Sequence, residues 1–129
     1  NNDKIHLVER VDRLELVSLL SRSKYALSTI PPKGFLKQIS PTKLTEYMAS
    51  GCVVIAFKGI PDQDYLIQES GCGFLIDFSE EALTNKMKDL SKVNYKDLMF
   101  KGINGRNMIF NERSYDFLFK KYIKEVNKF

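Results

Sequence analysis

The chain has 129 residues, of which 43% are hydrophobic and 28% are charged, and its formal net charge is +4. These values are typical of one globular domain, and the small excess of positive charge does not indicate nucleic-acid binding. The longest apolar run, Cys52–Phe57, is far too short to cross a membrane. Two cysteines do not make a disulfide scaffold, so both are expected to be free thiols in a reducing compartment.

Strands and helices are predicted to alternate from the start of the chain. Residues 4–11 alternate weakly between apolar and polar side chains, which favours a strand. Residues 13–22 carry leucines at helical spacing, and Asp12 can cap the amino end of that helix. Residues 24–30 are predicted to form a second strand, followed by a loop that begins with two prolines.

A serine and a proline mark the start of the next helix. Ser40 is the expected N-cap and Pro41 the first helical residue, and the helix should end near Ser50. Gly51 is the expected left-handed terminator. The run 52–57 is apolar without alternation, which is typical of a strand covered on both faces in a parallel sheet.

The rest of the chain continues the alternation. A helix is predicted over 62–70, ended by Gly71–Gly73, then a strand over 74–78, a helix over 79–92, and helices near 94–110 and 112–127. This order predicts an α/β domain with a parallel sheet flanked by helices. Ligands in such sheets bind beyond the carboxyl ends of the strands, so the loops that follow the strands are the candidate region for a site.

Glu46 has two interpretations. On a helical wheel Leu44, Tyr47 and Met48 form the buried stripe, and Glu46 points away from it. It can be a solvated carboxylate that pairs weakly with Lys43. Alternatively, it lies one turn inside a helix whose amino end faces the strand ends, where phosphates bind readily and a carboxylate can accept hydrogen bonds from sugar hydroxyls.

Other polar motifs favour structural roles. The sequence DQD at 62–64 resembles a metal-binding motif, but it lies at a helix start, where aspartates are expected as caps, so no metal site is predicted. His6 is the only histidine and is expected to be structural or exposed. The C-terminal helix has an apolar stripe, which predicts packing on the core with lysines outside; an absent partner domain or an anionic membrane is the alternative partner for it.

The run SPTKLTEYMASGCVVIAF, residues 40–57, resembles the signature of glycosyltransferases of the family 4 type (glycosyl transferases group 1). Residues 11–29 and 59–77 are similar to neighbouring segments of that family. The resemblance implies a Rossmann-like domain that is the C-terminal, nucleotide-sugar-binding half of a GT-B fold, lacking its first strand and helix. Residues 1–129 would then be part of a larger protein whose N-terminal acceptor domain is absent.

The resemblance also implies roles for individual residues. Glu46 matches the second glutamate of the family's E-x7-E pattern, which binds the ribose, and Gln38 stands where the first, catalytic-site glutamate would be. The loop that would hold the diphosphate and the sugar comprises Ser40, Pro41, Thr42 and Lys43. The region that would contact the base includes Val11 and Arg13.

The implied function is that of a retaining glycosyltransferase, which moves a sugar from a nucleoside diphosphate sugar to a glycan or a lipid-linked acceptor. Neither a metal nor another cofactor is expected. The location would be cytoplasmic, and peripheral contact with the inner face of the membrane is an alternative. The chain alone is expected to be inactive. Two alternatives stay open: a nucleotide-sugar epimerase domain, and a non-catalytic α/β interaction module.

Overall fold

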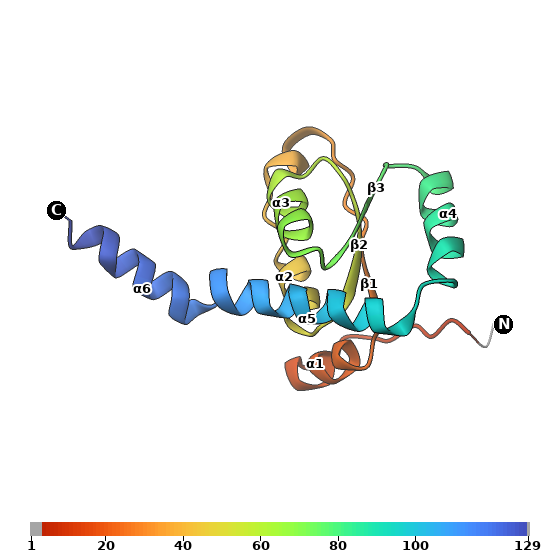
Figure 1. Cartoon of the computed structure of the whole chain (residues 1–129), viewed down its shortest axis with the longest axis horizontal. Coiled ribbons are helices and arrows are strands. Elements are labelled where there is room, and N and C mark those ends of the chain that lie inside the picture. Colours follow the sequence, from red (N-terminus) through yellow and green to blue (C-terminus); the bar gives the residue numbers. More distant parts are fainter. Residues whose placement is uncertain (1–3, 129) are drawn as a thin grey trace.

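The computed structural model describes residues 4–128 and contains a parallel sheet with helices on both faces (Figure 1). The strands are β1 (Tyr25–Ser28), β2 (Val53–Phe57) and β3 (Gly73–Ile76), in the order β1-β2-β3, and both neighbouring pairs are parallel. The predicted α/β class with a parallel sheet is therefore confirmed.

The central strand β2 forms the middle of the core. Val54 and Ala56 pack on one face with helices α2 (Thr42–Ala49), α3 (Pro61–Ser70) and α5 (Tyr95–Glu112). Ile55 and Phe57 pack on the other face with α4 (Glu80–Leu90). Since both faces are covered, all of β2 is buried, which confirms the interpretation of its unbroken apolar run.

Two crossover helices bring their amino ends to the carboxyl edge of the sheet. The chain passes from β1 through α2 to β2, and from β2 through α3 to β3. A helix that connects parallel strands runs back across the sheet, so α2 and α3 both begin where the preceding strand ends. The candidate region predicted for ligands therefore has two helix amino ends beside it.

Helix α5 lies against α2 and α3 through two glycines. A Cβ atom built at Gly102 would lie 2.3 Å from the carbonyl oxygen of Gly51, and one at Gly105 would lie 2.7 Å from Cβ of Cys72. A larger side chain at Gly102 would push α5 away from the turn before β2, and one at Gly105 would push it away from Cys72, just before β3. Arg113, the residue after α5, contacts Asp62 at the amino end of α3.

Several helix ends follow the local sequence. Asp12 caps α1 (Arg13–Ser21) by accepting from the backbone of Glu15 at 2.8 Å, and Ser79 caps α4 by accepting from Ala82. Gly71 ends α3 in the left-handed conformation at φ 64°. The predicted cap at Asp12, the predicted helix start at residue 79 and the predicted helix end at Gly71 are confirmed, because these contacts join residues within one helical turn. Gly51, after α2, has φ 81°, which confirms the predicted left-handed terminator.

The predicted start of α2 is wrong by one residue. Pro41, at φ −71° and ψ 108°, is the extended N-cap rather than the first helical residue, and no side chain caps the helix. Ser40 donates its hydroxyl hydrogen bond to the carboxylate of Asp62 instead, at 2.6 Å. A carboxylate is a stronger acceptor than a neutral group, so the Ser40 hydroxyl pairs with Asp62, and no side chain satisfies the first N–H groups of α2.

The N-terminal strand prediction is also wrong. Residues 4–11 form no strand in the described chain, and Leu7 is 96% exposed. A weak alternating pattern does not make a strand without a neighbouring strand to pair with, and β1, at the edge of the sheet, pairs only with β2. The predicted loop after β1 contains a short 3-10 helix, η1 (Gly34–Gln38).

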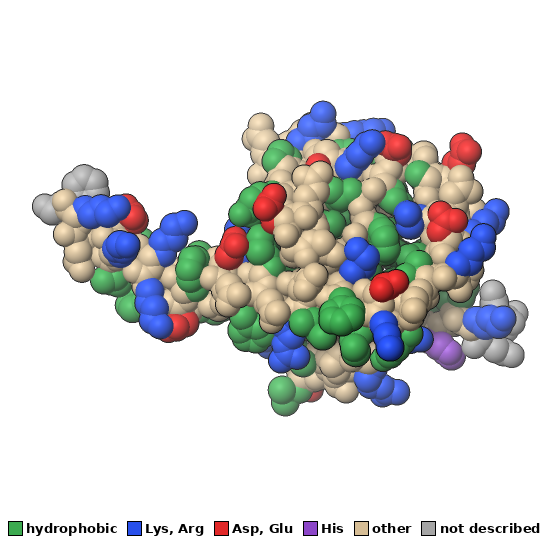
Figure 2. All heavy atoms as spheres, viewed as in Figure 1, with side chains coloured by type: hydrophobic (Ala, Val, Ile, Leu, Met, Phe, Trp, Pro, Cys, Tyr) green, Lys and Arg blue, Asp and Glu red, His purple; other side chains and the backbone are tan. Residues whose placement is uncertain are grey.

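The prediction that the C-terminal helix packs on the core is wrong. Helix α6 (Tyr115–Val126) has no buried residue and extends away from the body of the molecule (Figure 1). Its apolar stripe is exposed; Tyr115 is 92% exposed and Tyr122 66%. Helices α2, α3 and α5 already cover that face of the sheet, so no surface of the described chain receives the stripe. Figure 2 shows lysine and hydrophobic side chains along this projecting helix.

None of the helices in residues 4–128 combines the length and the apolar character needed to cross a bilayer.

Candidate ligand-binding site

A pocket of about 340 Å³ lies at the carboxyl edge of the sheet. Its walls come from η1, the segment before α2, the amino end of α3 and the residue after α5. The lining residues are Lys37, Gln38, Ile39, Ser40, Pro61, Asp62 and Arg113. The pocket thus joins parts of the chain that are far apart in sequence, at the edge where parallel sheets bind ligands.

The loops after β1 and β2 are held together at this edge. Gly59 has φ 107°, and a Cβ atom there would lie 2.9 Å from Cβ of Pro32. The backbone N–H of Gly59 donates to the carboxylate of Asp64 at 2.7 Å. Asp64 is thereby used to hold the turn into α3, which is the structural role expected for an aspartate at this position.

A buried hydrogen-bond chain fixes the amino end of α3. Ser28, the last residue of β1, donates its hydroxyl to Oε1 of Gln63 at 2.6 Å, and Nε2 of Gln63 donates to the carbonyl of Phe57 at 2.7 Å. Gln63 is fully buried and Ser28 is 4% exposed. The central residue of the DQD motif is therefore a link between two strand ends, a role that the sequence did not reveal.

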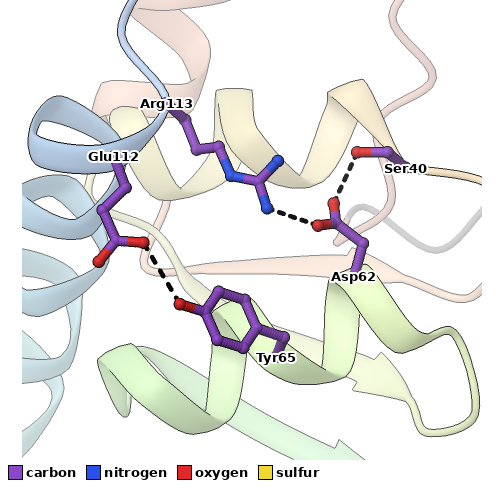
Figure 3. Close-up of polar contacts among 5 residues, drawn as sticks. All are labelled: Ser40, Asp62, Tyr65, Glu112 and Arg113. Carbon is purple, nitrogen blue, oxygen red and sulfur yellow. Dashed lines mark hydrogen bonds and ion pairs between the residues drawn. The ribbon is translucent and has the colours of Figure 1, made fainter. Parts of the chain in front are cut away.

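The first aspartate of the motif joins three elements (Figure 3). Oδ2 of Asp62 accepts from Ser40 at 2.6 Å, and Oδ1 accepts from Nη2 of Arg113 at 2.5 Å. Beside this group the hydroxyl of Tyr65 donates to Glu112 at 3.4 Å. The Glu112 carboxylate raises the pKa of Tyr65 above its ordinary value, because it disfavours a second negative charge nearby.

Residues 62–64 thus have protein partners of their own. In residues 4–128, no three histidine, cysteine, aspartate or glutamate side chains lie together in a way that could hold a metal ion. The two aspartates of the motif instead contact Ser40, Arg113 and Gly59.

Some residues predicted from the family resemblance line the pocket, and others lie beside it at the start of α2. Gln38 and Ser40 line the pocket. Pro41 is buried, and the side chains of Thr42 and Lys43 are exposed at the start of α2. An amino-terminal helix turn has backbone N–H groups without partners inside the helix, so this segment can donate to an anion beside the pocket.

Glu46 lies one turn further along α2 and is exposed. Leu44 and Met48 are fully buried and Tyr47 is partly buried, which confirms the predicted stripe and leaves Glu46 on the solvent side. The weak pair with Lys43 is not formed, since Glu46 makes no ion pair in the described chain. Burial, followed by the charge of Glu46, raises the pKa of the neighbouring Tyr47.

Val11 and Arg13 are not among the pocket residues. They lie at the start of α1, whose carboxyl end contacts the opposite edge of the sheet: Sγ of Cys52, just before β2, donates to the carbonyl of Leu20 at 3.3 Å. In Figure 1, α1 lies below the sheet, at the opposite edge from the loop that follows β1. The structure therefore brings Gln38 and Ser40 together but does not bring Val11 or Arg13 to them.

Two pocket residues have no signal in the sequence. Arg113 is far from Asp62 along the chain, and nothing in its neighbourhood marks it as a site residue. Lys37 is exposed on η1, within a loop predicted only as turn-rich. Together they give the pocket two cations against the one carboxylate of Asp62, so its field favours an anion.

No protein-family model, no curated protein and no solved structure matches this chain. The assignment of a function therefore depends on the motif residues and on the geometry of the carboxyl edge.

Proposed function

We propose that the chain is the donor-binding domain of a retaining glycosyltransferase with a GT-B fold. The observation that carries the proposal is the position of Glu46: it is exposed one turn inside α2, the helix whose amino end follows the pocket residues Gln38 and Ser40. A parallel sheet binds its ligand at this edge, and the helix start offers donors for phosphate.

In this proposal each part of the edge takes one part of a nucleoside diphosphate sugar. The backbone N–H groups of Thr42 and Lys43 donate to the diphosphate, and the carboxylate of Glu46 accepts hydrogen bonds from the ribose hydroxyls. Gln38 faces the sugar, where its amide can bond a hydroxyl without adding charge. Catalysis would come from positioning the donor and from stabilising the diphosphate as it leaves, while the acceptor binds to another domain.

Binding of UDP, GDP and ADP to the full-length protein tests the proposal by isothermal titration calorimetry. Glu46→Gln removes the charge and keeps the shape, and it should weaken binding about tenfold or more, because hydrogen bonds to a charged group contribute roughly 1.5–3 kcal/mol. Glu81→Gln is the matched control, since Glu81 is an exposed carboxylate on α4, on the other face of the sheet.

Two results would overturn the proposal. If none of the three nucleotides binds, the chain is better described as a non-catalytic interaction module. If one binds with equal affinity to the Glu46→Gln and Glu81→Gln variants, the assignment of Glu46 is wrong.

A further inference from the structure

Arg113 occupies a junction in the fold. It follows α5 directly, and the next residue, Ser114, caps α6 by accepting from the backbone of Phe117 at 3.2 Å. Its side chain turns back toward the sheet and reaches Asp62 at the amino end of α3 (Figure 3). The guanidinium is therefore held at the carboxyl edge although the chain around it leads away from the body.

The guanidinium is positioned to bind a further anion. The side chains of Arg113 and Asp62 are 31% and 26% exposed, so the pair is accessible at the pocket. One nitrogen of Arg113 is used by Asp62, whereas a guanidinium carries five N–H donors in a planar fork. Lys37 and the hydroxyl of Ser40 line the same pocket.

Phosphate is the ligand chemistry that suits these groups. Arginine binds phosphate through two parallel N–H···O bonds, and a lysine adds charge without a fixed direction. The carboxylate of Asp62 is the opposing charge, and within residues 4–128 it is the one acceptor of the Arg113 side chain. An arriving phosphate would thus exchange for Asp62 on the guanidinium or bind to the donors that Asp62 leaves unused.

We infer that Arg113 is a phosphate-binding residue of this pocket and that Asp62 is the counter-ion of its guanidinium until the ligand binds. The inference rests on the proposed function, because it assigns the diphosphate of the nucleotide to the pocket. Arg113, which follows α5, would thus give the diphosphate a cationic partner in addition to the backbone donors at the start of α2.

The test measures binding of inorganic pyrophosphate and of UDP, GDP and ADP to the full-length protein by calorimetry. Arg113→Gln should weaken pyrophosphate and nucleotide binding at least about tenfold, and Arg113→Lys should recover part of the loss. Arg106→Gln is the matched control: it removes the same charge from α5, but Arg106 does not line this pocket.

Asp62→Asn separates a phosphate contact from a structural role. It breaks the same ion pair as Arg113→Gln but leaves the guanidinium free and removes the opposing charge. We expect this variant to bind pyrophosphate at least as tightly as the wild type. If both Asp62→Asn and Arg113→Gln lose binding equally, the ion pair acts only by holding the fold, and the inference is overturned.

The outcomes also separate this inference from the proposed function. Nucleotide binding that depends on Glu46 but is equal in the Arg113→Gln and Arg106→Gln variants overturns the inference alone. Pyrophosphate binding that depends on Arg113, without any nucleotide preference or dependence on Glu46, supports the phosphate site and overturns the proposed function. Absence of binding to all four probes overturns both.

Discussion

Replacing Gln63 by alanine should destabilise the domain more than any exposed change on the same helix. The side chain is fully buried and makes two hydrogen bonds, accepting from Ser28 at 2.6 Å and donating to the carbonyl of Phe57 at 2.7 Å. Alanine removes both bonds and leaves the buried hydroxyl of Ser28 without this acceptor. It also opens a cavity where the amide was.

The magnitude follows from these losses. Two net hydrogen bonds contribute about 2 kcal/mol, and the unpaired buried hydroxyl adds about 1 kcal/mol or more. We therefore expect the free energy of unfolding to fall by about 3 kcal/mol for Gln63→Ala. For a domain of this size that corresponds to a decrease in Tm of about 10 °C. Ser28→Ala removes one of the bonds and should cost about 1–2 kcal/mol.

Urea unfolding followed by far-UV circular dichroism measures these differences. Gln68→Ala is the matched control, because Gln68 lies on the same helix and is exposed; it should change the free energy by less than about 0.5 kcal/mol. The double variant Ser28→Ala, Gln63→Ala should lose less than the sum of the single variants, since they share one bond. A Gln63→Ala variant within about 1 kcal/mol of Gln68→Ala would refute the reasoning, because two buried hydrogen bonds cannot cost so little.

Three further predictions concern packing, pH and the C-terminal helix. Gly102→Ala should lower the free energy of unfolding by about 1–3 kcal/mol in urea, because its Cβ would lie 2.3 Å from the carbonyl oxygen of Gly51; an unchanged midpoint would show that α5 can move away freely. Burial raises the pKa of the Cys72 thiol above its ordinary value of 9.0, so the unfolded chain ionises first and stability should fall as the pH rises through and above about 9. A Cys72→Ala variant should show a smaller fall over the same range, and an equal one would contradict this cause. Ending the chain after Ser114 should lower Tm by no more than a few degrees, because α6 buries no residue, and a loss above about 10 °C would contradict its exposed position.

Local features of the structure could be predicted from the sequence because their contacts are local. The caps at Asp12 and Ser79 and the left-handed end at Gly71 each involve residues within one turn, and the apolar run of β2 indicates burial on two faces by its composition alone. The same information predicted the parallel α/β order and the exposed side of α2 that carries Glu46.

Errors arose where a pattern depends on a neighbour that the sequence does not identify. The alternation in residues 4–11 forms no strand, because β1 pairs only with β2. The apolar stripe of α6 does not identify the surface that it would contact. In the described chain α6 buries no residue, so the core does not cover the stripe. Amphipathic spacing reports which side chains lie together and not what covers them.

The sequence by itself thus determined the fold class and the alternation of helices and strands from residue 13 onward. Its ligand segment, Gln38 to Glu46, stays a prediction. Only the tertiary structure decided which side chains complete that edge: Gln63 linking two strand ends, and Arg113 returning from the end of α5 to Asp62. Gln63 lies 35 residues from Ser28, and Arg113 lies 51 residues from Asp62, so these contacts depend on how the strands and helices pack together. Local propensity and periodicity do not encode such contacts, because they result from the packing of the whole core.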